Sequence, residues 1–409
     1  MNIIFLTIGD MSDLGESGMY PDLLKSFRDH GHQLYLLCSR ERRSGLPTQR
    51  AMEYGMEVLR VRTGNITKSN LIEKGITTLL IGRQFKAAIK KYYRGIQFDL
   101  ILYSTPPITL ATTVSYLKER DHAYCYLMLK DIFPQNALDI GLLKRKGWKQ
   151  FITNYFFAKE KNLYLLSDCI GCMSQANVEY VKSHYPYLTN KRIEVCPNTI
   201  CSNHSSIQSL LSKNSLRERY QLPKDKVILV SIGNFGKPQG VDFILQILYK
   251  NIGQEKFHFV LCGSGTEYHR IKTFAKHSFN HVTVMDRIQM GEVNSLLMAC
   301  DIGLIFLDHH FTIPNFPSRM LDYMKNSMPI LAATDHNTDL GETILRGAFG
   351  WWCESNDVDD YQKILKVIEE NPNDILDKGE NSKLYLTQFF DTERAYRIIM
   401  KALMEDKST

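Results

Sequence analysis

The feature that most constrains this chain is an alternation of short apolar runs with helical patterns, which occurs twice along the sequence. In the first half the strand-like runs cover residues 2–8, 34–37, 58–61, 100–103, 123–129 and 169–173. The alternation restarts at 227–232 and continues through 258–262, 282–284, 302–306 and 330–332. Strands that alternate with helices indicate parallel, doubly wound sheets. The sequence therefore predicts an α/β protein with two Rossmann-like domains.

A segment rich in Ser and Asn separates the two series of runs. Residues 201–216 show little periodicity, as expected of a linker, and a chain of 409 residues is long enough to bury two cores. We therefore expect a first domain over 1–200, a linker over 201–216 and a second domain over 217–382. The last periodic pattern, 383–404, predicts one helix in a C-terminal segment that covers 383–409.

Charge and cysteine content restrict the environment of the protein. Residues 1–200 carry 27 Lys and Arg against 18 Asp and Glu, so the first domain suits an anionic surface. Nine scattered cysteines form no disulfide framework and are typical of a reducing compartment. The apolar run at the N-terminus is short and has no basic leader, so we expect a cytoplasmic protein.

Two basic regions in the first domain are candidates for membrane contact. Residues 65–94 combine apolar positions with Lys and Arg, and 144–149 add the sequence Lys-Arg-Lys-Gly-Trp-Lys. Such segments can lie on an anionic bilayer, although solvated helix faces are an alternative explanation. No recognised nucleic-acid-binding motif surrounds them, so nucleic acid is not an expected partner.

The segment from Asn315 to Ala333 contains the most specific pattern. Pro317 suits the first turn of a helix, Ser318 can cap it, and apolar residues follow at helical spacing. The amides of such a helix start, together with Arg319, can hold a diphosphate. Asp322 lies about one and a half turns into the predicted helix and can accept hydrogen bonds from a ribose.

Two glycine-rich turns follow predicted strands of the second domain. Residues 231–240 precede a predicted helix over 241–249, and residues 261–267 end the strand at 258–262. Glycines let the backbone approach phosphate oxygens, and Lys237 supplies a positive charge in the first turn. For each turn, a plain tight connection is the alternative.

These segments together resemble the donor site of retaining GT-B glycosyltransferases, specifically family 4 in its capsule, O-antigen and colanic-acid branch. The resemblance implies the GT-B fold, with two Rossmann-like domains that face a central cleft and a C-terminal helix that crosses back to the first domain. It implies that a UDP-linked sugar is bound in the second domain and a lipid-linked saccharide acceptor in the first. The implied donor-binding residues are Gly18, Gly233, Asn234, Gly236, Gly263, Gly265, Arg287, Ser318, Arg319 and Asp322.

The same resemblance assigns roles in catalysis. Asp131, in the stretch Leu129 to Pro134, would lie near the acceptor hydroxyl, and a helix N-cap is the alternative role for this residue. Arg319 and Lys237 would stabilise the departing diphosphate, and no metal or other cofactor is implied. The enzyme would be hexosyltransferase-type and would act with retention in bacterial surface polysaccharide biosynthesis. It would be cytoplasmic and peripheral on the inner face of the cell membrane.

The chain departs from the family pattern at two polar positions. The first motif acid falls on Pro314, and a Lys usual before the last glycine of the first loop is Gln239. These departures motivate one alternative, a catalytically lapsed subunit that binds a nucleotide sugar. The other alternative is a GT-B nucleotide-sugar epimerase, which would share the fold but need no lipid-linked acceptor.

Overall fold

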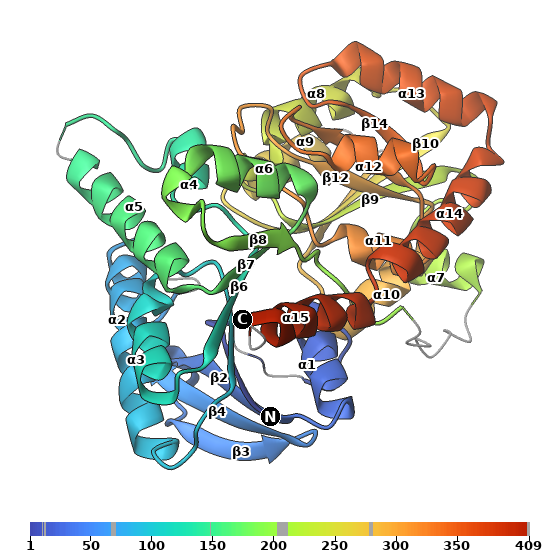
Figure 1. Cartoon of the computed structure of the whole chain (residues 1–409). Helices are drawn as coiled ribbons and strands as arrows, with labels where there is room; N and C mark the ends of the chain where they lie inside the picture. The colour runs from blue at the N-terminus through green and yellow to red at the C-terminus, as the bar shows by residue number, and fades with distance from the viewer. Residues whose placement is uncertain are drawn as a thin grey trace. The chain divides into compact units, whose positions relative to one another are not determined.

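The computed structural model describes residues 1–9, 11, 14–66, 71–147, 149–202, 212–277 and 281–406. The chain forms two compact units, the first from Met1–Cys201 with Thr392–Thr409 and the second from Ser202–Asp391 (Figure 1). Most of the predicted linker lies outside the described residues, and α7 (Lys213–Arg219) begins near its end. Two separate sheets of mostly parallel strands confirm the predicted fold class.

The sheet of the first unit has eight strands in the order β3-β4-β2-β1-β5-β6-β7-β8. Its neighbours pair in parallel except for β3 and β4. The winding direction changes between β1 and β5, as in a doubly wound sheet. The strands are β1 (Asn2–Leu6), β2 (Gln33–Glu41), β3 (Gln49–Glu53), β4 (Met56–Thr63), β5 (Leu100–Ser104), β6 (Tyr124–Leu129), β7 (Cys169–Cys172) and β8 (Arg192–Val195).

Two edge strands of this sheet were not predicted from the sequence. Strand β3 turns back into β4 through Tyr54 and Gly55, which both have positive φ. Strands β3 and β8 are short and rich in charged side chains, because an edge strand is partly exposed to solvent. They therefore lack the apolar run that identifies a central parallel strand.

Seven α-helices of the described chain belong to the first unit. They are α1 (Met19–Asp29), α2 (Leu71–Tyr92), α3 (Ala111–Asp121), α4 (Gln135–Asp139), α5 (Lys149–Leu166), α6 (Gln175–His184) and α15 (Thr392–Asp406). Helix α15 lies beside α1, as Figure 1 shows. Its Ile399 and Leu403 join Phe27 of α1 in a buried core with residues of β1 and β2.

The prediction of one helix over 383–404 is wrong, because the chain breaks into α14 (Asp374–Phe389) and α15. At the break, Asp391 accepts a hydrogen bond from the Ser202 amide at 3.0 Å. The Thr392 amide donates to the Ile200 carbonyl at 3.2 Å. These bonds tie the break to a segment far away in the sequence, so helical periodicity alone could not reveal it.

The sheet of the second unit has six strands in the order β11-β10-β9-β12-β13-β14, all parallel. Its winding direction changes between β9 and β12. The strands are β9 (Val227–Asn234), β10 (Phe257–Ser264), β11 (Val282–Asp286), β12 (Ile302–Phe306), β13 (Ile330–Thr334) and β14 (Gly350–Glu354), of which only β14 was missed. The helices besides α7 and α14 are α8 (Val241–Lys250), α9 (Tyr268–Ala275), α10 (Met290–Ala299), α11 (Met320–Lys325), α12 (Leu340–Arg346) and α13 (Val358–Glu370).

None of the helices in the described part of the chain is both long enough and apolar enough to cross a membrane.

Candidate active site

In the second unit, the loops that follow β9 and β12 meet at the carboxyl edge of the sheet. The Asp308 amide, just after β12, donates a hydrogen bond to the carbonyl of Pro238 at 3.0 Å. The two strands are neighbours at the point where the winding direction changes. Ligands of open α/β sheets bind at such points, so this edge is the natural location for a ligand.

The two glycine-rich turns interlock. The Phe235 amide donates to the Ser264 carbonyl at 2.7 Å. A Cβ on Gly263 would lie 1.8 Å from the carbonyl oxygen of Gly233, and a Cβ on Gly265 would lie 2.2 Å from that of Phe235. Both glycines are therefore required for the close packing of the two loops, whether or not a phosphate binds there.

Arg319 joins the second motif to the first glycine-rich turn. Its Nη1 donates to the carbonyl of Ile232 at 2.9 Å. Gly233 has φ +136°, and a Cβ there would lie 3.1 Å from the guanidinium carbon, so glycine leaves room for the arginine. Within the described residues this is the one hydrogen bond that the guanidinium donates, although it carries five N–H groups. A guanidinium can donate two parallel hydrogen bonds to one phosphate group, so Arg319 beside this loop suits a diphosphate ligand.

The helix after Pro317 is shorter than the sequence predicts. Helix α11 has six residues and begins at Met320, and no side chain caps it, so the expected cap by Ser318 is wrong. The Leu321 amide donates instead to the Ser318 carbonyl at 3.0 Å, which forms a tight turn before the helix. Asp322 consequently lies in the first turn, where its side chain is exposed.

Most of the loop from Phe311 to Phe316 is buried. Phe311, Ile313 and Phe316 are buried, and so is Pro314, at the position of the missing motif acid. Thr338 Oγ1 donates to the Asn315 carbonyl at 2.5 Å and holds the loop against the turn after β13. Packing therefore accounts for an apolar residue at position 314.

Gln239 has a structural role in the first glycine-rich turn. Its Oε1 accepts a hydrogen bond from the Gly236 amide at 3.0 Å and closes the 3-10 turn η4 (Lys237–Gln239). The Lys237 side chain is exposed and forms neither a hydrogen bond nor an ion pair with any residue that the structure describes. Of the two residues, Lys237 is the one that can reach an anionic ligand.

Asn234 and Arg287 lie at the same carboxyl edge. Asn234 ends β9, pairs with Ser264 of β10 and has an exposed side chain. Arg287 follows β11 and is also exposed, beside Asp286, which forms an ion pair with Lys272 at 2.6 Å. The carboxyl ends of β9, β10, β11 and β12 thus bring the predicted donor-site residues of this unit to one edge.

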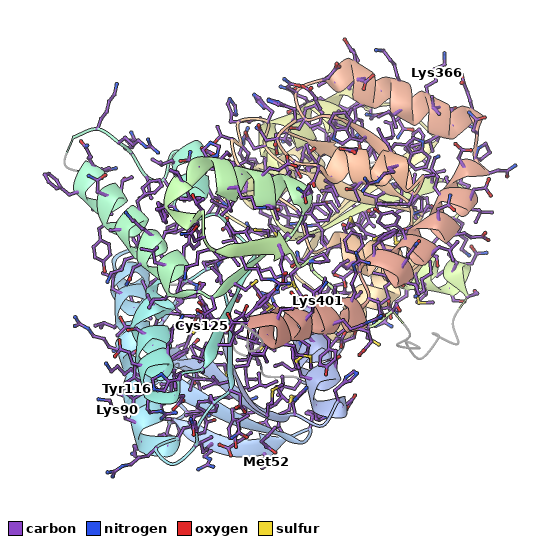
Figure 2. The ribbon with its side chains drawn as sticks, viewed as in Figure 1. Met52, Lys90, Tyr116, Cys125, Lys366 and Lys401 are labelled. Carbon is purple, nitrogen blue, oxygen red and sulfur yellow. The ribbon has the colours of Figure 1, made fainter. Side chains whose placement is uncertain are left out.

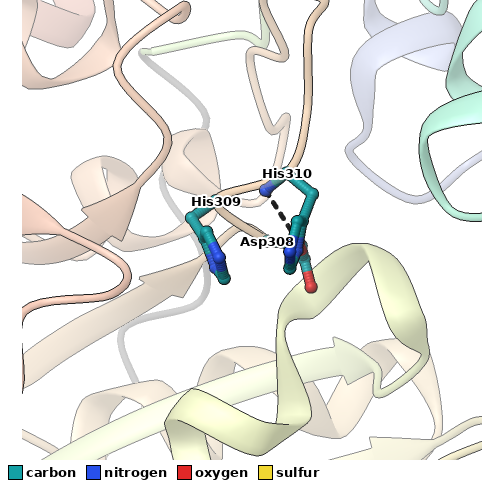
Figure 3. Close-up of side chains that lie close together, drawn as sticks. All are labelled: Asp308, His309 and His310. Carbon is teal, nitrogen blue, oxygen red and sulfur yellow. Dashed lines mark hydrogen bonds and ion pairs between the residues drawn. The ribbon is translucent and has the colours of Figure 1, made fainter.

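Among the residues that the structure describes, Asp308, His309 and His310 form a cluster at this edge that could hold a metal ion (Figure 3). Their nearest ligand atoms lie within 4.8 Å of one another, and the two imidazole rings are 3.8 Å apart. Imidazole nitrogens and a carboxylate are ligands that suit zinc and similar cations. His310 Nδ1 also lies 2.7 Å from Asp308 Oδ1, so a hydrogen bond can satisfy this pair without a metal.

Sequence reasoning missed Asp335, which follows β13. Its Oδ1 accepts hydrogen bonds from the amides of Asn337 at 2.9 Å and Thr338 at 3.2 Å. Its buried Oδ2 has no hydrogen-bond partner among the described residues. Burial raises the pKa of this carboxyl to about 6, and the amide hydrogen bonds oppose the rise. An acid directly after an apolar strand was the available signal.

In the first unit, Asp131 follows β6 at the carboxyl edge of the sheet. Thr105 Oγ1, in the turn after β5, donates to the Asp131 carbonyl at 3.0 Å. The carboxyl accepts a hydrogen bond from Asn136 Nδ2 at 2.8 Å, whereas no side chain caps α4, so the N-cap alternative is wrong. Burial raises the pKa of the Asp131 carboxyl, and the bond from Asn136 opposes this rise.

Sequence reasoning also missed Glu160, which lies on α5. Its side chain is fully buried and accepts hydrogen bonds from the hydroxyls of Tyr164 at 2.9 Å and Tyr185 at 3.1 Å. Burial raises the pKa of Glu160 to about 8; the tyrosine bonds lower it, and the charge of Asp131 adds to the rise. A single acid in a helix rich in aromatic residues was a signal in the sequence.

Gly18 is the residue before α1. Its φ of 177° is extended backbone that any residue adopts, and its carbonyl accepts a hydrogen bond from the Asp22 amide at 2.9 Å. A Cβ at this position would lie 3.6 Å from Pro21, which is an ordinary contact. Neither the backbone nor the packing therefore requires glycine at position 18.

Comparison with known proteins gives a family match for the second unit. Residues 212–384 match the model of the family described as Glycosyl transferases group 1. A probable glycosyltransferase from Pseudomonas aeruginosa, WbjE, is 21% identical over 307 residues, which cover 71% of this chain and 70% of the relative. The O-antigen biosynthesis glycosyltransferase WclY of Escherichia coli is 23% identical over 211 residues, or 51% of this chain and 52% of WclY.

Solved structures extend the likeness to the whole chain. Sucrose-phosphate synthase from Thermosynechococcus elongatus has a TM-score of 0.76 at 14% identity and covers 100% of both chains. HepE from Anabaena, solved in complex with UDP, has a TM-score of 0.67 at 14% identity and covers 99% of this chain and 100% of its own. At such identities the likeness concerns the fold alone.

Proposed function

We propose that this chain, which has the GT-B fold and a glycosyl transferases group 1 domain in its second unit, transfers a sugar from a nucleoside-diphosphate sugar to a saccharide acceptor. The observation that carries the proposal is the contact between Arg319 and the first glycine-rich turn. The guanidinium lies against Gly233 and donates a hydrogen bond to the Ile232 carbonyl, at the edge of the sheet where the winding direction changes between β9 and β12. A doubly negative leaving group is the ligand that this arrangement fits best.

The donor is proposed to be UDP-linked. HepE, a neighbour in fold, was solved with UDP, and this supports the choice of nucleotide. Arg319 and Lys237 stabilise the departing diphosphate, and each such electrostatic contact is typically worth about 3 to 4 kcal/mol in the transition state. The proposed reaction is of the hexosyltransferase type, retains the configuration of the sugar and uses no metal cofactor. The leaving diphosphate itself assists removal of the acceptor proton.

The acceptor is proposed to be a lipid-linked saccharide in bacterial surface polysaccharide biosynthesis. The name of WclY, an O-antigen biosynthesis enzyme, supports this class of acceptor. Asp131 orients the acceptor hydroxyl from the first unit, and its half-buried side chain follows β6 at the carboxyl edge of that sheet. A lipid-linked acceptor implies a protein that works in the cytoplasm, peripherally attached to the inner face of the membrane.

A second candidate is a catalytically lapsed subunit that binds a nucleotide sugar. Pro314 is buried and Gln239 closes a turn, so two motif positions serve packing in this chain. A nucleotide-sugar epimerase is a third candidate, but a basic first domain is not needed for a reaction without a lipid-linked acceptor. Transfer by the purified protein to lipid-linked saccharides would exclude the lapsed subunit and the epimerase.

A thermal-shift experiment tests the donor site first. The melting temperature is measured with UDP, GDP, ADP or dTDP and without nucleotide, for wild type, Arg319→Ala and Arg270→Ala. Arg270 is the matched control, because it lies in the same unit on α9, where it pairs with Asp242 and Glu267. Preferential binding to the folded state raises the melting temperature.

We expect UDP to stabilise the wild type and Arg270→Ala by the same increment. The increment should disappear in Arg319→Ala, even if that substitution also lowers the melting temperature without nucleotide. Equal stabilisation of all three proteins would remove Arg319 from the donor site. Absence of stabilisation by any nucleotide would overturn the proposal.

A further inference from the structure

An apolar stripe runs along the outer face of α5. Phe151 has 80% of its surface exposed, Tyr155 43% and Leu165 42%, and these residues recur at helical spacing. The opposite row of the helix, Thr153, Glu160, Leu163 and Tyr164, is buried. Leu142, in the turn before α5, is 64% exposed. Soluble surfaces rarely gather large apolar side chains in this way without a partner.

Positive charge surrounds this stripe. Residues 140–165 contain six Lys and Arg and a single acid, Glu160, which is fully buried. Lys159 Nζ lies 5.4 Å from the centre of the Tyr155 ring, and Lys161 Nζ lies 4.8 Å from that of Tyr187. The outer surface of this segment therefore presents only positive charge, together with apolar and amphipathic aromatic side chains.

The surface adjoins the loop that carries Asp131. The ring of Phe133, two residues after Asp131, packs edge-on against Phe156 of α5 with centroids 5.4 Å apart. Arg145 lies over Phe157 of α5 at 5.4 Å. A bilayer in contact with α5 would thus hold the head group of a lipid close to the carboxyl edge of the first sheet.

From these observations we propose that the outer face of α5 and the turn at 142–147 form the contact surface of this protein with an anionic lipid bilayer. The apolar side chains enter the interface between head groups and acyl chains, and the basic side chains bind lipid phosphates. The inference deepens the proposed function, since it rests on a lipid-linked acceptor and names the surface that meets the membrane.

Helix α2, which lies in the other basic region that the sequence suggested for membrane contact, is less suited to this role. Lys86 and Lys90 point to Tyr116 of α3, with ammonium-to-ring distances of 5.0 and 5.2 Å, and Figure 2 shows Lys90 and Tyr116 together. Its exposed large apolar side chains are Leu79 and Leu80, among those that the structure describes. Trp148, part of the second basic cluster, lies outside the described residues.

Vesicle sedimentation tests the surface without any need for catalysis. The full chain is mixed, without nucleotide, with vesicles of phosphatidylglycerol and phosphatidylethanolamine or of phosphatidylcholine alone. One variant combines Phe151→Ser with Tyr155→Ser, and another combines Lys144→Gln, Lys146→Gln and Lys149→Gln. The matched controls are Leu79→Ser with Leu80→Ser on α2, and Tyr249→Ser with Ile252→Ser in the second unit, where both side chains are exposed.

We expect the wild type to bind only the anionic vesicles. Removal of three positive charges should weaken binding about a hundredfold, and removal of the two aromatic rings at least about tenfold. Both control variants should bind like wild type. Because no donor is present, this result is independent of whether the proposed transfer occurs.

Several outcomes would overturn the inference. One is loss of binding in the α2 variant with retention in both α5 variants, and another is equal binding of all proteins. Failure of the wild type to bind anionic vesicles would do the same. A change of oligomeric state in the α5 variants, measured by light scattering and without a change in vesicle binding, would assign the surface to a protein partner instead.

Discussion

At the scale of single residues, the first unit contains two neighbouring carboxyl groups that differ in their surroundings. Asp131 accepts a hydrogen bond from an amide at the edge of the sheet, whereas Glu160 is enclosed by tyrosine hydroxyls. Burial disfavours the charged form of both, so the pKa of each carboxyl is raised. Protein stability should therefore depend on pH through Glu160, and transfer should depend on the charge of Asp131.

Replacement of Glu160 by Gln should change how stability depends on pH. Burial raises the pKa of Glu160 from its ordinary value of 4.5 to about 8 in the native state. Between these values the native state keeps a proton that the unfolded state releases, so stability falls as pH rises. The Gln side chain of Glu160→Gln cannot titrate. The free energy of unfolding of this variant relative to wild type should therefore rise by up to a few kcal/mol between pH 5 and pH 8. Urea denaturation at pH 5 and pH 8 measures this, and a constant difference between the proteins would contradict it.

Replacement of Asp131 by Asn should abolish transfer and leave the fold intact. The Asn side chain can still accept the hydrogen bond from Asn136, but it supplies no charge to the acceptor. We expect transfer to fall by about 10² to 10⁴ with little change in melting temperature. Asp139→Asn, on the adjacent helix α4, is the control and should retain activity. Full activity of Asp131→Asn would exclude its catalytic role.

At the scale of elements, the donor edge of the second unit depends on two loops that only glycine allows to touch. The loop after β10 lies so close to the loop after β9 that Gly265 cannot accept a Cβ without a shift of backbone. Its φ of +150° adds conformational strain for any other residue. Rigid contact between the loops fixes the backbone that Arg319 and Lys237 flank.

Gly265→Ala should therefore destabilise the second unit and weaken nucleotide binding. The new Cβ would lie 2.2 Å from the Phe235 carbonyl oxygen, and we expect a cost of about 2 to 4 kcal/mol. Gly253→Ala is the matched control, since Gly253 also has a positive φ but no neighbour within 4 Å. The free energy of unfolding of Gly253→Ala should fall by only about 1 kcal/mol, and UDP should still raise its melting temperature. Equal losses in both variants, measured by denaturation, would show that the loops can separate.

At the scale of the whole molecule, the chain forms two units, each with its own core, and only the first unit is built from two separate segments of the sequence. The first unit takes its last helix from the C-terminus, where Ile399 is fully buried. The second unit has its own core, a cluster that contains Leu365 of α13 together with residues of β9 and α8. The two cores share no residue, so a cavity in one should not weaken the other directly.

Truncation of one core residue in each unit tests this division. Ile399→Ala should cost about 2 to 5 kcal/mol and raise hydrogen exchange in β1 and α1. Leu365→Ala should have a similar cost but raise exchange in β9 and α8. Peptide-resolved hydrogen exchange of both variants measures the pattern, and each variant is the control for the other. Increased exchange throughout the chain in either variant would indicate a single cooperative unit.

The amino-acid sequence by itself determined the class of fold and much of the candidate site. Apolar runs and helical spacing are local properties, so the central strands and the helix α8 could be predicted from neighbouring residues alone. Polar residues and glycines directly after strands indicated the carboxyl edges, because parallel strands end on one side of a sheet. Asp131 was singled out by this reasoning, whereas Arg319 was singled out by its place at a predicted helix start after Pro317.

Tertiary structure decided what depends on contacts between distant segments. The edge strands β3 and β8, the break at Asp391 and the late start of α11 follow from pairing and turns that apolar periodicity does not encode. The burial of Glu160 and Pro314 likewise comes from elements remote in sequence. The placement of Arg319 against Gly233 requires β9 and β12 to be neighbours. Strand order is a property of the folded chain, because it minimises the free energy of the whole core and not of any one segment.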